Sequence, residues 1–309
     1  MLAFALILTA AKLAGWLSNR IGQPAVFGEI LVGLILGPSL LNMLGWPIFA
    51  SHMEGATAIV HTGEESLQSP LYHTIISLAE FGVILLMFMA GLETDMKEMK
   101  RVGKVAFWAA VGGVIGPLLF GWGSAEGFRI LGLNFTFYET IFIGIILTAT
   151  SVSISAQTLI ELNKLSSKEG TTILGAAVID DVIGIIILSF VIAFKPASAG
   201  GVDGAENLVG HVMHWLTSAG VVSEGAAGFL RILILVALMI LFFVSAIWFG
   251  RKYFERILKW TFESPISQGL LTAAIILGIM YAWAAEFVGS VAAITGSYIA
   301  GILVGYYLG

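Results

Sequence analysis

Long apolar segments alternate with short polar ones along the chain. A helix needs about 20 consecutive, predominantly apolar residues to cross the hydrocarbon core of a bilayer. The pattern therefore predicts an all-α polytopic membrane protein. Nine transmembrane helices are expected, at residues 1–18, 25–44, 71–91, 105–123, 137–159, 169–194, 228–250, 266–284 and 287–308.

The composition supports a membrane protein and excludes several kinds of function. Hydrophobic residues make up 58% of the 309 residues and charged residues 11%, whereas roughly 25% of the residues in soluble domains are charged. The lack of cysteine rules out disulfides, thiolate metal sites and cysteine nucleophiles. The charge pattern indicates no nucleic-acid partner. We expect the lipid bilayer as a partner and no cofactor.

The positions of the basic residues predict the orientation of the helices. Most of them follow the odd-numbered apolar segments: Arg20, Lys97, Lys100, Arg101, Lys104, Lys164, Lys168, Arg251, Lys252, Arg256 and Lys259. The alternate segments have only Arg129, Lys195 and Arg231, and Lys12 lies within the first apolar segment. Because cytoplasmic loops carry an excess of Lys and Arg, the odd-numbered loops are predicted to be cytoplasmic and the N-terminus outside.

Two adjacent aspartates, Asp180 and Asp181, lie near the middle of segment 169–194. An Asp at the centre of a transmembrane helix costs roughly 2.5 to 3.5 kcal/mol on insertion scales. Both side chains are therefore expected to face a water-filled cavity or a partner helix. Desolvation and mutual repulsion oppose ionisation of both carboxyl groups at once. The pair can hold protons or a small cation, and this competition is the chemical basis of exchange.

Segment 137–159 contains a dense patch of hydroxyl side chains in its second half. The candidate residues are Thr148, Thr150, Ser151 and Ser153. A single hydroxyl usually bonds back to its own helix, but this density favours a discontinuous helix that offers oxygens to an ion. Glu29 and Glu80 are further acids within apolar segments. They are candidate accessory acids, for which packing, gating and proton entry all remain open.

A short glycine pattern occurs twice in the chain. Residues 28–37 (Gly-Glu-Ile-Leu-Val-Gly-Leu-Ile-Leu-Gly) match residues 296–305 (Gly-Ser-Tyr-Ile-Ala-Gly-Ile-Leu-Val-Gly), with three glycines in register. A chance match between two glycine-rich helices is the alternative. The predicted topology runs the second segment outward and the ninth inward, and opposed directions are what an inverted repeat requires.

Four motifs together resemble the second family of monovalent cation:proton antiporters, and most closely its bacterial sodium/proton exchangers. They are Phe-Gly-Glu-Ile-Leu-Val-Gly-Leu-Ile-Leu-Gly-Pro (27–38), Leu-Leu-Met-Phe-Met-Ala-Gly-Leu-Glu-Thr (85–94), Ala-Thr-Ser-Val-Ser-Ile-Ser-Ala (149–156) and Ile-Leu-Gly-Ala-Ala-Val-Ile-Asp-Asp-Val-Ile-Gly (173–184). The resemblance implies a homodimer in a bacterial cell membrane. It also implies thirteen helices in two inverted repeats with discontinuous helices. By the same resemblance, Asp180 and Asp181 together would bind the transported sodium. Asp181 would be the principal carrier of cation and proton. Asp180 would be its neighbour, which pairs with a lysine of the second repeat in electrogenic members.

The resemblance also divides the chain into parts. It implies scaffold and dimerisation helices at residues 1–104, a transport core at 105–194, an extracytoplasmic connection at 195–227, a linking helix at 228–250 and further scaffold helices at 251–309. The sequence ends at Gly309, before the expected lysine-bearing helix. We therefore expect a fragment or a truncated product, and the predicted function is that of the full-length parent.

The predicted function is exchange of Na⁺, or of Li⁺ or K⁺, for protons by alternating access, without enzyme activity. One alternative is a potassium efflux system of the same superfamily, whose members tend to have Gln in place of the first aspartate. A second is an intramembrane aspartyl protease, which needs acids that face each other from two helices. Adjacent helical residues diverge by about 100°, which argues against it. A third is a fragment that does not transport.

Overall fold

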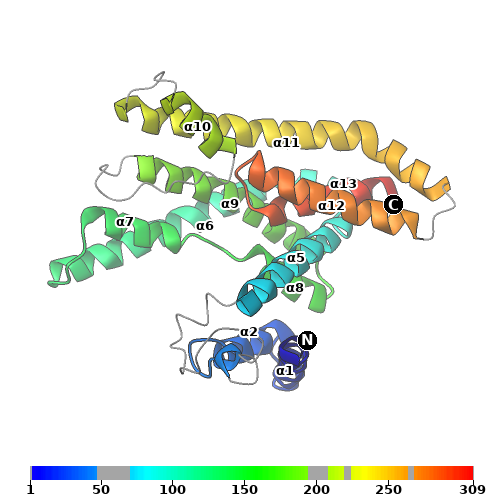
Figure 1. The fold of residues 1–309 in the computed structure, drawn as a ribbon, viewed down its shortest axis with the longest axis horizontal. Coiled ribbons are helices and arrows are strands. Elements are labelled where there is room, and N and C mark those ends of the chain that lie inside the picture. The colour runs from blue at the N-terminus through cyan, green and yellow to red at the C-terminus, as the bar shows by residue number, and fades with distance from the viewer. Residues whose placement is uncertain (1, 47–69, 194–207, 219–223, 264–267, 309) are drawn as a thin grey trace. The chain divides into compact units, whose positions relative to one another are not determined.

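The computed structural model describes residues 2–46, 70–193, 208–218, 224–263 and 268–308, and in these ranges it contains helices and no strands (Figure 1). The predicted all-α fold class is confirmed. The helices are α1 (Leu2–Arg20), α2 (Ala25–Leu36), the short 3₁₀ helix η1 (Met43–Gly45), α5 (Pro70–Leu92), α6 (Met96–Ile130), α7 (Phe137–Ile146), α8 (Val152–Glu161), α9 (Lys168–Ala193), α10 (Leu208–Ser218), α11 (Glu224–Glu263), α12 (Gly269–Phe287) and α13 (Ala293–Leu308).

Six of the described helices are long and apolar enough to cross a membrane: α1, α5, α6, α9, α11 and α12. The shorter apolar helices α2, α7 and α13 correspond to the other three predicted segments. The protein is thus a multi-pass membrane protein, and the count of nine spans stays a prediction. Helix α2 ends at Leu36, earlier than predicted, because Gly37 and Pro38 follow and a residue before proline avoids helical geometry.

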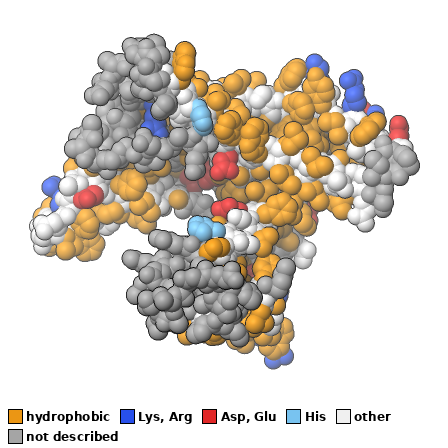
Figure 2. Space-filling view, in the orientation of Figure 1, with side chains coloured by type: hydrophobic (Ala, Val, Ile, Leu, Met, Phe, Trp, Pro, Cys, Tyr) orange, Lys and Arg blue, Asp and Glu red, His pale blue; other side chains and the backbone are white. Residues whose placement is uncertain are grey.

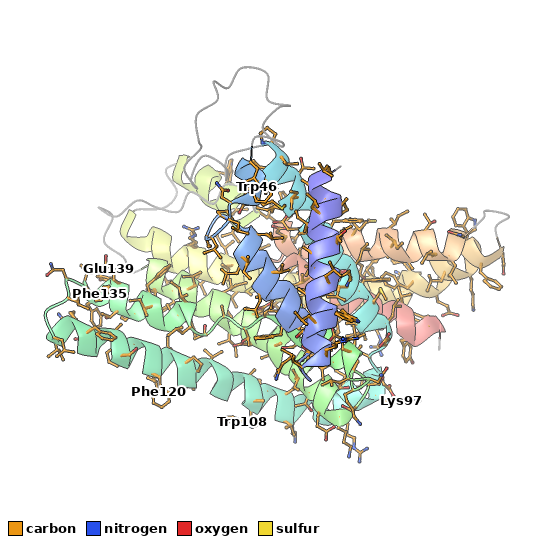
Figure 3. The ribbon with its side chains drawn as sticks, turned by 90° about the horizontal axis from the view of Figure 1, so that it is seen from below. Trp46, Lys97, Trp108, Phe120, Phe135 and Glu139 are labelled. Atoms are coloured by element: carbon orange, nitrogen blue, oxygen red, sulfur yellow. The ribbon has the colours of Figure 1, made fainter. Side chains whose placement is uncertain are left out.

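The outward side chains of the helices are largely apolar, as a lipid-facing surface requires (Figure 2). On α6, Trp108 is 70% exposed and Phe120 is 83% exposed. Both side chains project away from the neighbouring helices (Figure 3). In water such exposure would be costly, so these side chains are expected to contact lipid.

The chain forms two compact units. The first comprises Met1–Val83 with Gln157–Asn163, and the second comprises Ile84–Ala156 with Lys164–Gly309. Helices α5 and α8 therefore contribute residues to both. These units do not follow the predicted boundaries between scaffold and core, and that assignment stays a prediction. Asp180 and Asp181 belong to the second unit.

Each unit contains a helical hairpin in which the first glycine of the repeated pattern contacts the preceding helix. In the first unit, a Cβ added at Gly28 of α2 would lie 2.2 Å from the carbonyl oxygen of Ala14 in α1. In the second, a Cβ at Gly296 of α13 would lie 2.1 Å from the carbonyl oxygen of Tyr281 in α12. Small residues allow such close backbone approach between membrane helices. The two hairpins thus share a local contact, and the inverted repeat stays a prediction.

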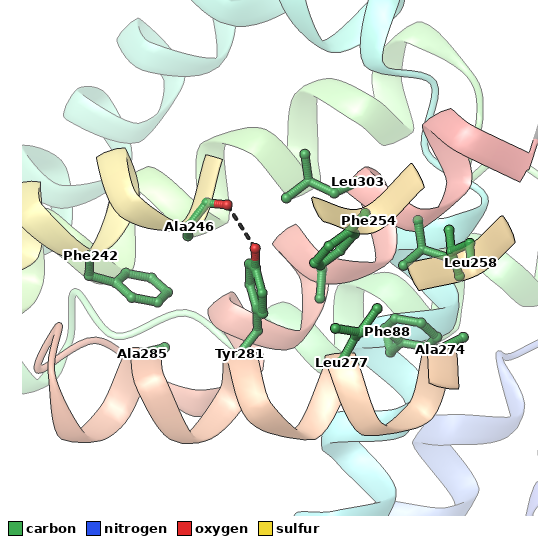
Figure 4. Packing of buried hydrophobic residues seen from close by; sticks show 12 residues of the cluster. Phe88, Phe242, Ala246, Phe254, Leu258, Ala274, Leu277, Tyr281, Ala285 and Leu303 are labelled. Carbon is green, nitrogen blue, oxygen red and sulfur yellow. Dashed lines mark hydrogen bonds between the residues drawn. The ribbon is translucent and has the colours of Figure 1, made fainter. Parts of the chain in front are cut away.

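The main hydrophobic core of the second unit lies where α11, α12 and α13 meet the end of α5 (Figure 4). Its largest members are Phe88, Phe242, Phe254 and Tyr281. The hydroxyl of Tyr281 donates a 2.7 Å hydrogen bond to the carbonyl oxygen of Ala246, which satisfies the polar end of an otherwise apolar side chain. This core fixes α13 against α11 and α12, and so determines where the first turn of α13 lies.

Helix α13 also packs closely against the end of α5, at Gly301. This contact allows a first prediction. A Cβ at Gly301 would lie 2.2 Å from the carbonyl oxygen of Phe88. Gly301→Ala is therefore expected to lower the stability of the protein by about 1–3 kcal/mol through overpacking. The melting temperature of the full-length protein in detergent measures the effect.

Gly112→Ala on α6 is the matched control, because a Cβ at Gly112 would meet no atom within 4 Å. It is expected to leave the melting temperature unchanged or to raise it, since Ala favours helix over Gly by about 1 kcal/mol. Equal melting temperatures for the two variants would contradict this account of the α5–α13 contact.

Candidate functional site

The predicted discontinuity in segment 137–159 is confirmed. Helix α7 ends at Ile146, α8 begins at Val152, and residues 147–151 are not helical. The amide and the hydroxyl of Thr148 both donate to the carbonyl oxygen of Ile145, at 3.0 and 2.8 Å. This tight turn ends α7, because a hydroxyl that bonds to nearby backbone competes with the helical pattern. At the other side of the break, the Ser151 hydroxyl accepts a hydrogen bond from the amide of Ile154 at 3.4 Å.

Asp180 lies on α9 and faces this break. Its side chain is buried, and its Oδ2 accepts a hydrogen bond from the hydroxyl of Thr150. Its Oδ1 is also buried and has no hydrogen-bond partner among the described residues. A buried carboxylate oxygen without a donor is costly. The break therefore brings one hydroxyl to Asp180 and leaves one carboxylate oxygen available for a proton or a cation.

Asp181 faces a different helix. The hydroxyl of Thr295, in the first turn of α13, donates to Asp181 Oδ2 at 3.5 Å, which is long for a hydrogen bond. Thr295 is only 1% exposed. Adjacent residues of a helix point about 100° apart, so Asp180 contacts the break between α7 and α8 while Asp181 contacts α13. The structure thus places the Asp181 carboxylate beside a buried hydroxyl of a second helix.

The other predicted hydroxyls bond locally. Thr148 bonds to its own turn, as described above, and the Ser151 and Ser153 hydroxyls lie 3.4 Å apart. Of the four candidate oxygens, only that of Thr150 forms a hydrogen bond with an aspartate among the described residues. A role for Thr148, Ser151 and Ser153 in binding stays a prediction.

The candidate accessory acids Glu29 and Glu80 belong to the first compact unit. Glu29 Oε1 forms a 3.0 Å ion pair with Lys12 Nζ, and its Oε2 accepts a 3.3 Å hydrogen bond from Gln157 Nε2. Glu80 is exposed. The ion pair explains how an acid and a lysine within apolar segments are tolerated, because intramembrane charges pair with one another. An accessory role for either glutamate stays a prediction.

Sequence reasoning missed Thr295. The sequence predicts a continuous helix over residues 287–308, and a single Thr within such a helix does not indicate a binding site. In the structure α12 ends at Phe287 and α13 begins at Ala293. Ser290, in the turn between them, has a left-handed backbone with φ of 51°. The turn places Thr295 at the start of a helix rather than in its middle, and Gly289 and Ser290 in the sequence could have indicated it.

Comparison with known proteins gives consistent matches. Residues 7–309 match the family model for the transmembrane sodium/hydrogen exchangers. A probable Na⁺/H⁺ antiporter of Bacillus cereus, GerT, is 35% identical over 300 residues, which cover 96% of this chain and 63% of that protein. The Na⁺/H⁺-K⁺ antiporter GerN of the same organism is 33% identical over 300 residues, covering 97% and 62%. A Na⁺/H⁺ antiporter of Enterococcus hirae is 42% identical over 189 residues, covering 61% and 42%. The chain spans less than two thirds of the length of these relatives.

Proposed function

The chain belongs to the sodium/hydrogen exchanger family, and from this premise we propose that the full-length protein is a secondary antiporter that exchanges Na⁺ for protons. The observation that carries the proposal is the aspartate pair on α9, with one carboxylate buried against a helix break and the other in loose contact with α13. Intramembrane acids of this kind mark ion pathways and proton relays.

The chemistry of the site supports competition between protons and a hard monovalent cation. Carboxylate and hydroxyl oxygens are the ligands that hard cations prefer. Asp180 Oδ1, Asp181 and the Thr150 hydroxyl supply such oxygens. The last carbonyl oxygens of α7 are less suitable ligands, because that of Ile145 accepts hydrogen bonds from Thr148 and that of Ile146 accepts one from the amide of Ala149 at 3.3 Å. A protonated carboxyl group is a poor cation ligand, so each cation bound displaces protons.

Two of the alternatives can now be weighed. The two acids lie on one helix and contact different elements, whereas an aspartyl protease needs two acids that share one water. Transport is the better supported function. Potassium is a second candidate cargo, because one relative carries K⁺ in its name.

A transport assay on the full-length protein tests the proposal. The protein is reconstituted into vesicles that contain a pH-sensitive dye, and Na⁺, Li⁺ or K⁺ is added outside. Na⁺ is expected to drive proton movement. A response to K⁺ alone would favour the second candidate, and no response to any of the three cations would contradict antiport.

Thr150→Val should weaken the apparent affinity for Na⁺. The change removes the hydroxyl that bonds to Asp180 and keeps the shape of the side chain. A hydrogen bond to a charged group contributes about 1.5–3 kcal/mol, which corresponds to a loss of affinity of about tenfold or more. The Na⁺ dependence of proton movement in vesicles measures it.

Thr261→Val on α11 is the matched control, because within the described residues the Thr261 hydroxyl bonds only to carbonyl oxygens of its own helix, at 3.0 Å. It is expected to keep the affinity for Na⁺. If Thr150→Val also keeps it, the Thr150 hydroxyl does not contribute to cation binding.

The homodimer implied by the resemblance is also proposed for the full-length protein. The mass of the protein in detergent, measured by light scattering after size exclusion, tests it. A monomeric mass over a range of protein concentrations would contradict it.

A further inference from the structure

A cavity of about 380 Å³ lies within the second compact unit, between α6, α9, α11 and α13. Most of its walls are apolar, with Val102 and Ala106 on α6, Val178 on α9, Phe243 and Ile247 on α11, and Ile302 on α13. Gly103 also borders it, and a Cβ at this position would meet no atom within 4 Å. The glycine therefore leaves room that a larger side chain would fill.

Two cationic side chains border the same cavity, Lys100 from α6 and Arg251 from α11. No Asp or Glu is among the described residues that line it. Both cations are exposed, and neither forms an ion pair with a described residue. Arg251 directly follows the apolar stretch of α11, and Lys100 precedes that of α6. The positive-inside rule assigns both positions to the cytoplasmic membrane surface.

The residues that line the cavity show how it is oriented. On α6 and α11 it extends from the two cations to Ala106 and Phe243, further along the apolar stretches. On α9 it reaches Ile179, next to Asp180. The cavity is thus an apolar slot that begins at the cationic level and extends toward the middle of the membrane.

The neighbouring part of α11 has the composition of a membrane interface. The ammonium of Lys252 lies 4.6 Å from the ring centre of Trp248 and 5.5 Å from that of Tyr253. Trp and Tyr collect at the level of the lipid headgroups. This places Arg251, the adjacent residue, at headgroup depth.

We propose that this cavity binds an anionic phospholipid, with one acyl chain in the apolar slot and the phosphate between Lys100 and Arg251. Basic pockets between transmembrane helices on the cytoplasmic side suit anionic headgroups, and a guanidinium can bind phosphate through two hydrogen bonds. The apolar walls would not hydrate an alkali cation, and the two positive charges would repel it. The proposal does not depend on which ion the protein transports.

The first experiment tests the headgroup contact. The purified full-length protein is titrated in detergent with phosphatidylglycerol or phosphatidylcholine that carry the same acyl chains, and the melting temperature is followed. Phosphatidylglycerol is expected to give the larger rise. In the double variant Lys100→Gln/Arg251→Gln, the apparent affinity for phosphatidylglycerol should fall by roughly tenfold or more, because each basic residue contributes to binding of an anionic lipid.

The control pair is Lys104→Gln/Arg256→Gln, which makes the same change of charge on the same two helices outside the cavity lining. It should keep the preference for phosphatidylglycerol. An equal loss in both pairs would show adsorption to a basic surface and overturn the site. An equal effect of both lipids on the unmodified protein would overturn the role of the headgroup.

The second experiment tests the apolar slot. Gly103→Leu should fill the cavity and remove bound phosphatidylglycerol, measured by native mass spectrometry. Gly112→Leu, on the same helix and also facing open space, should keep it. If Gly103→Leu retains the lipid as the unmodified protein does, the acyl chain does not lie in this cavity and the proposal fails.

Discussion

Asp181→Asn is expected to reduce Na⁺/H⁺ exchange to background while the protein still folds and inserts. Asn has nearly the same shape and keeps an oxygen that can accept the 3.5 Å contact from Thr295. It cannot release a proton or carry a negative charge in the physiological range. Exchange needs a group that alternates between proton and cation, so the loss should be complete rather than partial.

The measurement uses everted vesicles that contain the full-length protein and a dye that reports the pH gradient. Adding Na⁺ dequenches the dye when exchange occurs. Asp95→Asn is the matched control, because Asp95 caps the start of α6 through a 2.7 Å hydrogen bond from the amide of Lys97, and Asn caps helices about as well as Asp. Its dequenching should equal that of the unmodified protein. Retained dequenching in Asp181→Asn would remove Asp181 as the carrier.

Asp180→Asn is expected to make the apparent affinity for Na⁺ less dependent on pH. Deprotonated carboxylates bind the cation, so lowering the pH weakens binding, and each competing proton contributes up to about tenfold per pH unit. If both aspartates take up protons, the unmodified protein loses affinity more steeply than a protein with only Asp181. The buried Asp180 Oδ1, which has no partner among the described residues, is the atom where the proton or cation would bind.

The comparison to make is the apparent affinity for Na⁺ in the two proteins, from acidic to mildly alkaline pH. The sign is fixed by the competition: affinity falls as pH falls in both, with the smaller slope in Asp180→Asn. Superimposed profiles would show that Asp180 does not exchange protons with the site. Asp180 would then have a structural role, namely to hold Thr150 at the break between α7 and α8.

Several features could be predicted from the sequence because they depend on local composition. An apolar segment of sufficient length indicates a membrane helix wherever it packs. Two adjacent acids within such a segment indicate a function, because inserting them into the membrane costs free energy. The hydroxyl patch at residues 148–155 indicated the helix break, since hydroxyls that bond to nearby backbone compete with the helix. The predicted ends of some helices were wrong. Helices α6 and α11 extend well beyond the predicted apolar segments, because polar residues can continue a helix outside the membrane.

The partners of the two aspartates depend on the tertiary structure. Thr150 is 30 residues from Asp180, and Thr295 is 114 residues from Asp181. Helical periodicity places residues on a face of their own helix, but it does not say which helix that face meets. That choice depends on close backbone approaches such as that of Gly296 to Tyr281 and on the core around α11, α12 and α13. The sequence by itself determined a membrane protein with an acidic pair in one apolar segment and a break in another. Only the packing of distant helices decided that the two lie together, which hydroxyl reaches which carboxylate and where a cavity remains.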